Sequence, residues 1–175
     1  EVGNDLTVLY NRINATNIAI VDFLKKKGIT EEEISINAPE IIDMQAERYV
    51  GENKTYRYNV TTVITVTSAK VDLVRSLISE QSELLKQGIA ITGGDYRYQI
   101  QYDYTSLNEI KPKMIEEATK NAREAALKFA KDSDSELGKI RRASQGQFSI
   151  DNRDANTPYI KRIRVVTTID YLLED

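Results

Sequence analysis

The stretch YRYNVTTVITV, residues 56–66, decides the fold of this chain of 175 residues. Its even positions carry aromatic, aliphatic or threonine side chains, whereas its odd positions are mostly polar. An alternation with a period of two residues is typical of a β-strand that buries one face. The stretch therefore predicts a half-buried strand. Its buried face is formed by Tyr56, Tyr58, Val60, Thr62, Ile64 and Val66, and its polar face by Arg57, Asn59, Thr61 and Thr65.

Helical patterns flank this strand on both sides. Apolar residues recur at steps of three and four from Leu6 to Leu24, with Asp5 as the expected N-cap and Gly28 just past the expected end. On the C-terminal side, Ser68 is expected to cap a second helix, whose apolar positions run from Val71 to Leu85. These two patterns predict helices that pack against the strand.

Two further stretches have the pattern of strands. Residues 33–46 alternate but are interrupted by Pro39, which predicts a strand with a break, and Gly51 marks the turn that follows. After a turn at Thr92–Asp95, the alternation from Tyr96 to Tyr104 is strict, which predicts another strand.

The last third of the chain has one more helix and two more strands. The helix is expected from about Glu109 to Lys131, with Pro112 in its first turn, where proline is tolerated. Its apolar stripe is rich in alanine, which allows close packing. Strands are expected at 140–150 and at 163–171. The stripe consists of Ile110, Met114, Ala118, Ala122, Ala125 and Phe129.

Three amphipathic helices and about five strands with one polar face predict an α+β fold, with a mainly antiparallel sheet and the helices packed on one face. We expect a single domain over residues 1–175, made of two similar helix–strand–strand units and a joining helix–strand segment. The motifs VTTV at 60–63 and VTTI at 166–169 stand late in the two units, which suggests an internal duplication. The units are residues 5–67 and 107–173, and the joining segment is 68–105.

The residue inventory excludes several kinds of chemistry. The chain has neither Cys nor His, which excludes thiol and imidazole nucleophiles, thiol redox centres and the usual zinc sites. Its 24 basic and 27 acidic residues give a net charge of -3, which argues against nucleic-acid binding. The longest aliphatic run, Ile18–Val21, is far shorter than the ~20 residues that span a bilayer. We therefore expect no cofactor, metal site or nucleic-acid partner.

Four segments together resemble the SIMPL-domain family, a family of unknown function found in bacterial envelope proteins. Residues 24–35 resemble its helix–Gly–hydrophobic–acidic–Ile–Ser/Thr passage, and residues 58–74 are similar to its central strand–helix junction. Residues 118–140 resemble its alanine-rich helix leading into Leu-Gly, and residues 165–168 its closing strand. The order and spacing of the four segments carry the resemblance.

The resemblance implies a location and a role. It implies a periplasmic or cell-envelope location, self-association into large assemblies and a link to oxidative-stress defence, but it carries no catalytic residues onto this chain. Members usually begin with a strand before the first helix. We expect this chain to lack that strand, and we expect membrane contact only through a segment upstream of Glu1.

Two acidic stretches have the spacing of local caps rather than of sites. Thr30 and Glu33 fit a capping box on a single turn. The segment Asp132–Glu136 alternates oxygen ligands as calcium loops do, but its glycine stands at the seventh position of that frame and Ala143 stands where the bidentate Glu belongs. We assign it to a solvated helix end.

Two side-chain groups remain as candidate ligand-binding sites. The first is the tyrosine face of the expected strand, which could stack a planar or sugar ligand or simply be core under a helix. The second is the basic pair on the outer face of the last strands, which could hold an anion, a lipid headgroup or an acidic partner. The residues are Tyr96, Tyr98, Tyr102 and Tyr104 in the first group, and Arg162 and Arg164 in the second.

These observations favour a protein that is not an enzyme, namely a structural or assembly domain of the envelope. The alternative is a small-molecule or anion-binding module that uses one of the two candidate sites. A glycosidase-like enzyme with paired carboxylates is the least favoured, because no such pair stands apart from a helix end or a turn. We also expect at least a dimer, because polar sheet faces and uncovered sheet edges recruit other chains.

Overall fold

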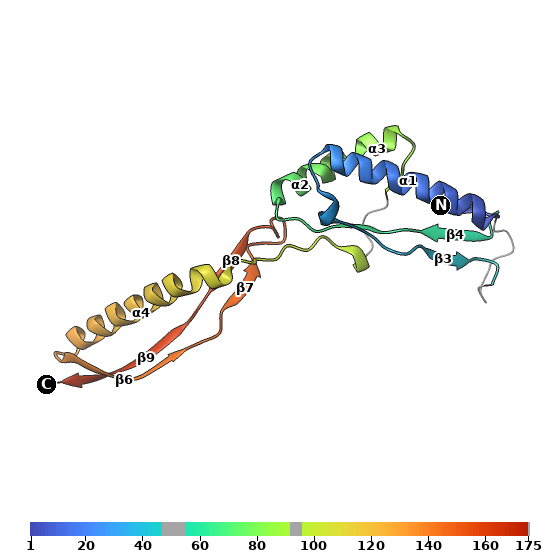
Figure 1. Ribbon diagram of the computed structural model, residues 1–175. Coiled ribbons are helices and arrows are strands. Elements are labelled where there is room, and N and C mark those ends of the chain that lie inside the picture. Colours follow the sequence, from blue (N-terminus) through green and yellow to red (C-terminus); the bar gives the residue numbers. More distant parts are fainter. Residues whose placement is uncertain (47–54, 92–95, 175) are drawn as a thin grey trace. The chain divides into compact units, whose positions relative to one another are not determined.

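The computed structural model describes residues 1–46, 55–91 and 96–174. The chain divides into two compact units, Glu1–Tyr98 and Gln99–Asp175. Each unit packs helix against antiparallel strands, so the predicted α+β class is confirmed (Figure 1).

The first unit contains most of the elements. Along the chain they are β1 (Val2–Gly3), α1 (Leu6–Lys26), the 3-10 turn η1 (Glu31–Glu33), β2 (Ile34–Ile36), β3 (Glu40–Asp43), β4 (Tyr58–Thr61), β5 (Ile64–Val66), α2 (Val71–Glu80), α3 (Ser82–Lys86) and the 3-10 turn η2 (Tyr96–Tyr98).

The ends of α1 follow from local chemistry. The Asp5 carboxylate accepts hydrogen bonds from the backbone N–H groups of Thr7 (2.8 Å) and Val8 (3.1 Å), as an N-cap does. At the other end Gly28 has a φ of +100°, and Ile29 N donates to Leu24 O at 3.1 Å. This left-handed residue ends the helix, because only glycine adopts such a φ without strain. Both predicted boundaries are confirmed.

The strands of the first unit form one long antiparallel hairpin that is broken in the middle. β2 pairs with β5 and β3 pairs with β4, and the break falls near Pro39, as predicted. The stretch 56–66, which was predicted as one strand, is likewise interrupted at Thr62–Val63, between β4 and β5. Its alternation is confirmed from Val60 onward, because Val60 is buried on one face while Thr61 and Thr65 are exposed on the other. The placement of Tyr56 on the buried face was wrong, because Tyr56 precedes β4 and is 45% exposed.

An opening strand is present, so the expectation that the chain lacks it was wrong. Val2 and Gly3 pair with Asn59 and Tyr58. The backbone of Glu1 continues the pairing, since its N donates to Val60 O (2.9 Å) and its O accepts from Val60 N (2.8 Å). Three residues are enough because β4 offers its unpaired edge to them. β4 is therefore the central strand of a three-stranded sheet, β1–β4–β3.

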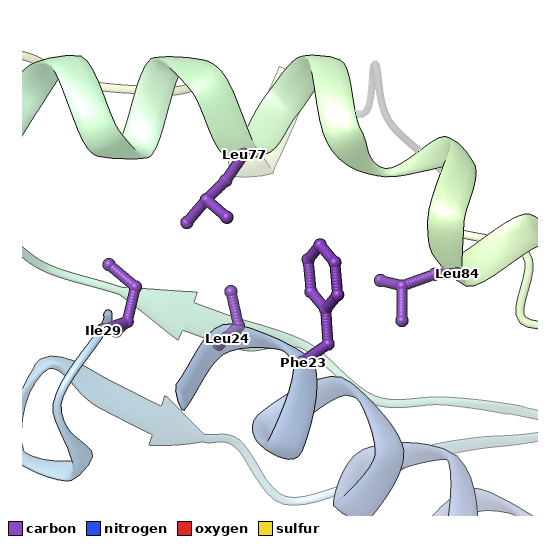
Figure 2. Close-up of a cluster of buried hydrophobic side chains, with 5 residues drawn as sticks. All are labelled: Phe23, Leu24, Ile29, Leu77 and Leu84. Carbon is purple, nitrogen blue, oxygen red and sulfur yellow. The ribbon is translucent and has the colours of Figure 1, made fainter. Parts of the chain in front are cut away.

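The core of the first unit lies between α1 and the helical pair α2–α3. Figure 2 shows Leu77 and Leu84 pointing from that pair toward Phe23, Leu24 and Ile29, at the end of α1 and just beyond it. Leu84 is 1% exposed and Ile29 2%. The predicted second helix is two helices, because it is interrupted at Gln81. Leu77 of α2 and Leu84 of α3 both belong to this cluster.

The second unit is one long helix on a second broken hairpin. Its elements are α4 (Leu107–Asp132), β6 (Glu136–Gln145), β7 (Ser149–Asn152), β8 (Lys161–Arg164) and β9 (Thr167–Glu174). β6 pairs with β9 and β7 with β8, both antiparallel, and α4 packs along β6 and β9 (Figure 1). The last predicted strand is therefore two strands.

The prediction for the long helix needs two corrections. Pro112 lies inside α4 and not in its first turn, so the carbonyl of Asn108 lacks the N–H donor that it would otherwise receive. Ala125 and Phe129 do not belong to the buried stripe: Phe129 is 75% exposed, whereas Ala126 is half-buried and Ala130 buried. A hairpin of two strands covers only a narrow arc of the helix surface, and Ala125 and Phe129 lie outside that arc.

Gly138 lies inside β6, whereas the left-handed residue after α4 is Asp134, with a φ of 53°. A Cβ atom at position 138 would lie 2.6 Å from the Glu174 Oε1 and 3.0 Å from the carbonyl oxygen of Leu172. Glycine is therefore needed at this position for the close approach of β6 and β9.

The predicted strand from Tyr96 to Tyr104 was wrong. Tyr96–Tyr98 form the 3-10 turn η2, and residues 99–105 pair with no strand in the described part of the chain. Burial alternates only at the end of the stretch, where Tyr102 and Tyr104 are half-buried while Gln101 and Asp103 are exposed; Tyr98 and Ile100 are exposed. A strand also needs a partner for its backbone groups, and period two in the sequence cannot supply one. The predicted turns at Gly51 and Thr92–Asp95 lie outside the described residues.

Candidate functional site

The first half of α1 and the β3 side of the sheet enclose an apolar groove of about 310 Å³. Its floor is Ile13 and Val60, which belong to a buried cluster with Leu9. Its rim is exposed, since Tyr10 is 63% and Ile41 53% accessible to solvent. The lining residues are Leu6, Thr7, Tyr10, Ile13, Pro39, Ile41 and Val60.

The groove is suited to apolar contacts. Its polar side chains are the hydroxyls of Thr7 and Tyr10, and none of the described residues that line it is charged. Sequence reasoning missed this groove, although a signal existed: Leu6, Tyr10 and Ile13 recur at helical spacing, and Ile41 follows the break at Pro39. That pattern predicted core packing and could not indicate that the helix leaves β3 partly uncovered.

A second hollow of about 340 Å³ lies where β1 meets α1. It is more polar than the groove, because Asn4, Asp5 and Arg12 line it together with apolar residues. Asp5 is already engaged as the helix cap. Among the described side chains, neither hollow is lined by Tyr98, Tyr102, Tyr104, Arg162 or Arg164.

Among the described carboxylates of the first unit, Glu33 has the most strongly lowered pKa. Its hydrogen-bond partners connect elements of the fold. It accepts hydrogen bonds from Thr30 N (2.8 Å), Ser68 Oγ (2.6 Å) and Lys70 Nζ (3.0 Å). These bonds, that of Ser68 above all, lower the pKa of Glu33 from 4.5 to about 2. Because Lys70 Nζ also donates to Gly28 O (2.9 Å), the cluster joins the end of α1 to the start of α2.

The Glu33 cluster confirms the capping box predicted for Thr30 and Glu33. It also corrects the cap predicted for the second helix. Ser68 does not cap α2 directly. Its Oγ accepts from the N–H of Lys70, the residue just before the helix, at 3.0 Å, and donates to Glu33. The Glu33 carboxylate is therefore engaged in hydrogen bonds that hold the fold together, and it is not positioned for acid–base catalysis.

Asp154 plays the same local role in the turn between β7 and β8. Its carboxylate accepts from Thr157 Oγ1 (2.5 Å), from Arg153 Nε (2.9 Å) and from the backbone N–H groups of Asn156 (2.9 Å) and Thr157 (2.8 Å). The Thr157 hydroxyl and the Arg153 guanidinium lower the pKa of Asp154 to about 2. These bonds fix the turn.

The four selected tyrosines do not form one face. Tyr98 is 48% exposed in η2, with the Arg97 guanidinium 5.3 Å from its ring centroid. Tyr102 lies in the second unit, edge-on to Tyr159 at 6.0 Å between ring centroids. Tyr104 is half-buried ahead of α4, and Tyr96 belongs to η2.

Arg162 and Arg164 lie on one exposed face of β8. Across the strand pair, Arg162 faces Asp151 and Arg164 faces Ser149. Within the described ranges, neither guanidinium has a carboxylate within 4.0 Å. The structure therefore places the two arginines together, as the alternation predicted.

The second unit exposes several large apolar side chains at one of its ends. The hairpin β6–β9 is two strands wide, and α4 covers one of its faces. At the end of the unit where β6 starts and β9 stops, five large apolar residues are at least 48% exposed. They are Leu127, Phe129, Ile140, Leu172 and Leu173.

The described residues contain neither a metal-binding cluster of acidic side chains nor a membrane-spanning helix. No group of three or more acidic side chains has the geometry to hold a metal ion over residues 1–46, 55–91 and 96–174. Among the helices of those ranges, none is long and apolar enough to cross a membrane.

Comparison with known proteins identifies a family. Residues 1–166 match the model of the SIMPL family, which is described as a protein of unknown function (DUF541). No curated protein matches the chain.

Proposed function

Starting from the membership of this chain in the SIMPL family, we propose that it is a structural assembly domain of the bacterial envelope and not an enzyme. In this proposal the chain associates with copies of itself, and any contribution to stress defence comes through that assembly. The perturbed carboxylates support the proposal, because Glu33 and Asp154 are held by bonds that stabilise a helix junction and a turn.

One observation carries the assembly proposal: the second unit leaves Phe129 and its apolar neighbours exposed. These exposed side chains do not form one patch, because Leu127 and Phe129 lie on opposite flanks of α4. Phe129 is the most exposed of them, at 75%, and aromatic anchors dominate the energetics of interfaces. A partner surface that covers Phe129 would gain binding energy without rearranging the fold.

The test is sedimentation velocity of the chain over a concentration series, compared with Phe129→Ser. We expect the wild-type chain to sediment faster as its concentration rises, and Phe129→Ser to remain closer to the monomer. Tyr10→Ser is the matched control, because Tyr10 is 63% exposed on the first unit. A wild-type chain that stays monomeric throughout would refute the proposal.

The envelope location rests on the family resemblance and needs its own experiment. We expect the natural gene product, with whatever precedes Glu1, to appear in the osmotic-shock or membrane fraction together with envelope markers. Recovery with a cytoplasmic marker enzyme would refute this part of the proposal and leave the assembly part standing.

A second candidate function is anion binding at Arg162 and Arg164. The pair favours it, because two exposed guanidinium groups on one strand face can hold a phosphate or carboxylate. Calorimetry with inorganic phosphate at low salt tests this candidate. We expect binding to be lost in Arg162→Gln/Arg164→Gln and retained in Arg123→Gln, which removes an exposed charge from α4.

A further inference from the structure

We propose that the hairpin of the second unit joins copies of this chain head to tail, with the free edge of β6 of one copy adding to the free edge of β9 of the next. This inference rests on the proposed self-association and names its surface. It commits to a second copy of the chain as the occupant of both edges.

Both edges of the hairpin have backbone groups that need partners. In the described part of the chain, β6 pairs with β9 alone. Gly146 N donates to Val166 O at 2.8 Å, so the N–H groups of Ala143 and Gln145 point away from β9. By the same alternation, Thr167 and Ile169 direct theirs away from β6. Such edges are templates for an added strand.

The helix above the hairpin is as wide as the hairpin itself. A helix with its side chains is about 10 Å across, while two paired strands lie about 4.8 Å apart. Ala126 and Ala130 face the strands, so Leu127 and Phe129 project from the opposite flanks of α4. A strand added at either edge would lie beneath one of these flanks and bury its apolar side chain.

The charges of the two edges select a head-to-tail contact over a symmetric one. β6 carries Lys139, Arg141 and Arg142, and β9 carries Asp170 and Glu174, all five exposed; β6 also has one exposed acid, Glu136. None of the five has an ion-pair partner within 4.0 Å in the described ranges. Pairing β6 with β6, or β9 with β9, would bring like charges together, which is unfavourable across strands. Pairing β6 with β9 joins opposite charges.

Cross-linking tests the contact directly, because the chain has no cysteine of its own. Ser144→Cys labels β6 and Thr168→Cys labels β9; both positions are exposed. The two variants, one with a longer tag, are mixed and oxidised to a disulfide, which joins cysteines on adjacent strands about 4.8 Å apart but not on next-nearest strands. We expect the mixed cross-linked product, and loss of cross-linking when either variant is treated alone. Glu117→Cys on α4, mixed with Thr168→Cys, is the control and is expected to give no product.

A proline variant provides a second measurement. Ala143→Pro removes an N–H group that points to the free edge, so the hairpin of its own chain keeps its bonds. We expect association to weaken by about tenfold, the effect of losing strand hydrogen bonds at the interface. The circular dichroism spectrum of the variant must match that of the wild type; if it does not, the cross-linking result decides.

The outcomes separate this inference from the proposed function. Mixed cross-links, with weaker association of Ala143→Pro, support strand addition between copies. Cross-links within either single variant would indicate a symmetric contact instead of a head-to-tail contact and would overturn the inference. Association of the wild type without any cross-link at these positions would also overturn it, while leaving self-association standing. A monomeric wild type would overturn both.

Discussion

Glu33 shows how a single side chain can look catalytic in a sequence and be structural in the fold. Three consecutive glutamates could form an acid–base cluster, but only Glu33 is drawn inward, to 17% side-chain exposure. Its bonds reach Thr30 on one side and Ser68 and Lys70 on the other, which belong to two different parts of the chain. The cluster therefore stabilises the junction of α1 and α2.

The lowered pKa of Glu33 predicts how stability depends on pH. Because the pKa falls from 4.5 to about 2 on folding, the folded state favours the charged form. This contribution is fully present above the unfolded value and is lost as the pH falls from about 4.5 toward 2. We expect Glu33→Gln to lower the free energy of unfolding near neutral pH and to flatten its acid dependence, measured by urea titration at several pH values.

The control for this prediction is Glu32→Gln, since the Glu32 side chain is exposed. Asp154 loses its own contribution over the same acid range, so only the difference between the two variants isolates Glu33. Equal acid dependence of Glu33→Gln and the wild type would contradict the assignment of the cluster.

The two leucines of α3 give a second prediction for single residues. Leu84 is 1% exposed within the cluster of Figure 2, whereas the adjacent Leu85 is 60% exposed. We expect Leu84→Ala to lower the free energy of unfolding by about 2–5 kcal/mol, because it leaves a cavity. Leu85→Ala should change it by less than about 0.5 kcal/mol. Similar losses for both variants in chemical denaturation would place the core elsewhere.

At the scale of elements, α4 carries a local conflict between sequence and structure. Pro112 lies inside the helix and removes one backbone hydrogen bond, which costs up to about 3 kcal/mol in a helix interior. We therefore expect Pro112→Ala to raise the free energy of unfolding of the chain. Lys113→Ala, at the next exposed position, is the control. A loss of stability in Pro112→Ala would mean that the proline is needed for the geometry of the second unit.

Periodicity and caps predicted the elements well where local signals suffice. Asp5 and Gly28 mark the two ends of α1, and the break between β2 and β3 falls near Pro39. Val60 is buried, as its position in the alternating stretch predicted. The prediction failed at Tyr96–Tyr104, because whether an extended segment joins a sheet depends on a partner strand far away in the sequence. For the same reason, the groove between α1 and β3 could not be found by reading either element alone.

At the scale of the whole molecule, the two units differ in how well the phenylalanine at the end of the long helix is covered. In the first, Phe23 at the end of α1 is 7% exposed under α2 and α3. In the second, Phe129 stands at the same place relative to the end of α4, since Ile29 N bonds to Leu24 O and Ser135 N to Ala130 O, yet it is 75% exposed. Both units join a helix to a broken antiparallel hairpin, and their origin by duplication stays a prediction.

This difference in cover is the basis of the central claim, which is self-association. The most direct measurement is the molar mass of the chain by light scattering after gel filtration, from about 1 to about 100 micromolar, a range in which contacts with dissociation constants near 10 micromolar become populated. We predict a mass that rises with concentration to multiples of the 19.9 kDa of one chain. A mass that stays at 19.9 kDa over the whole range would contradict the account.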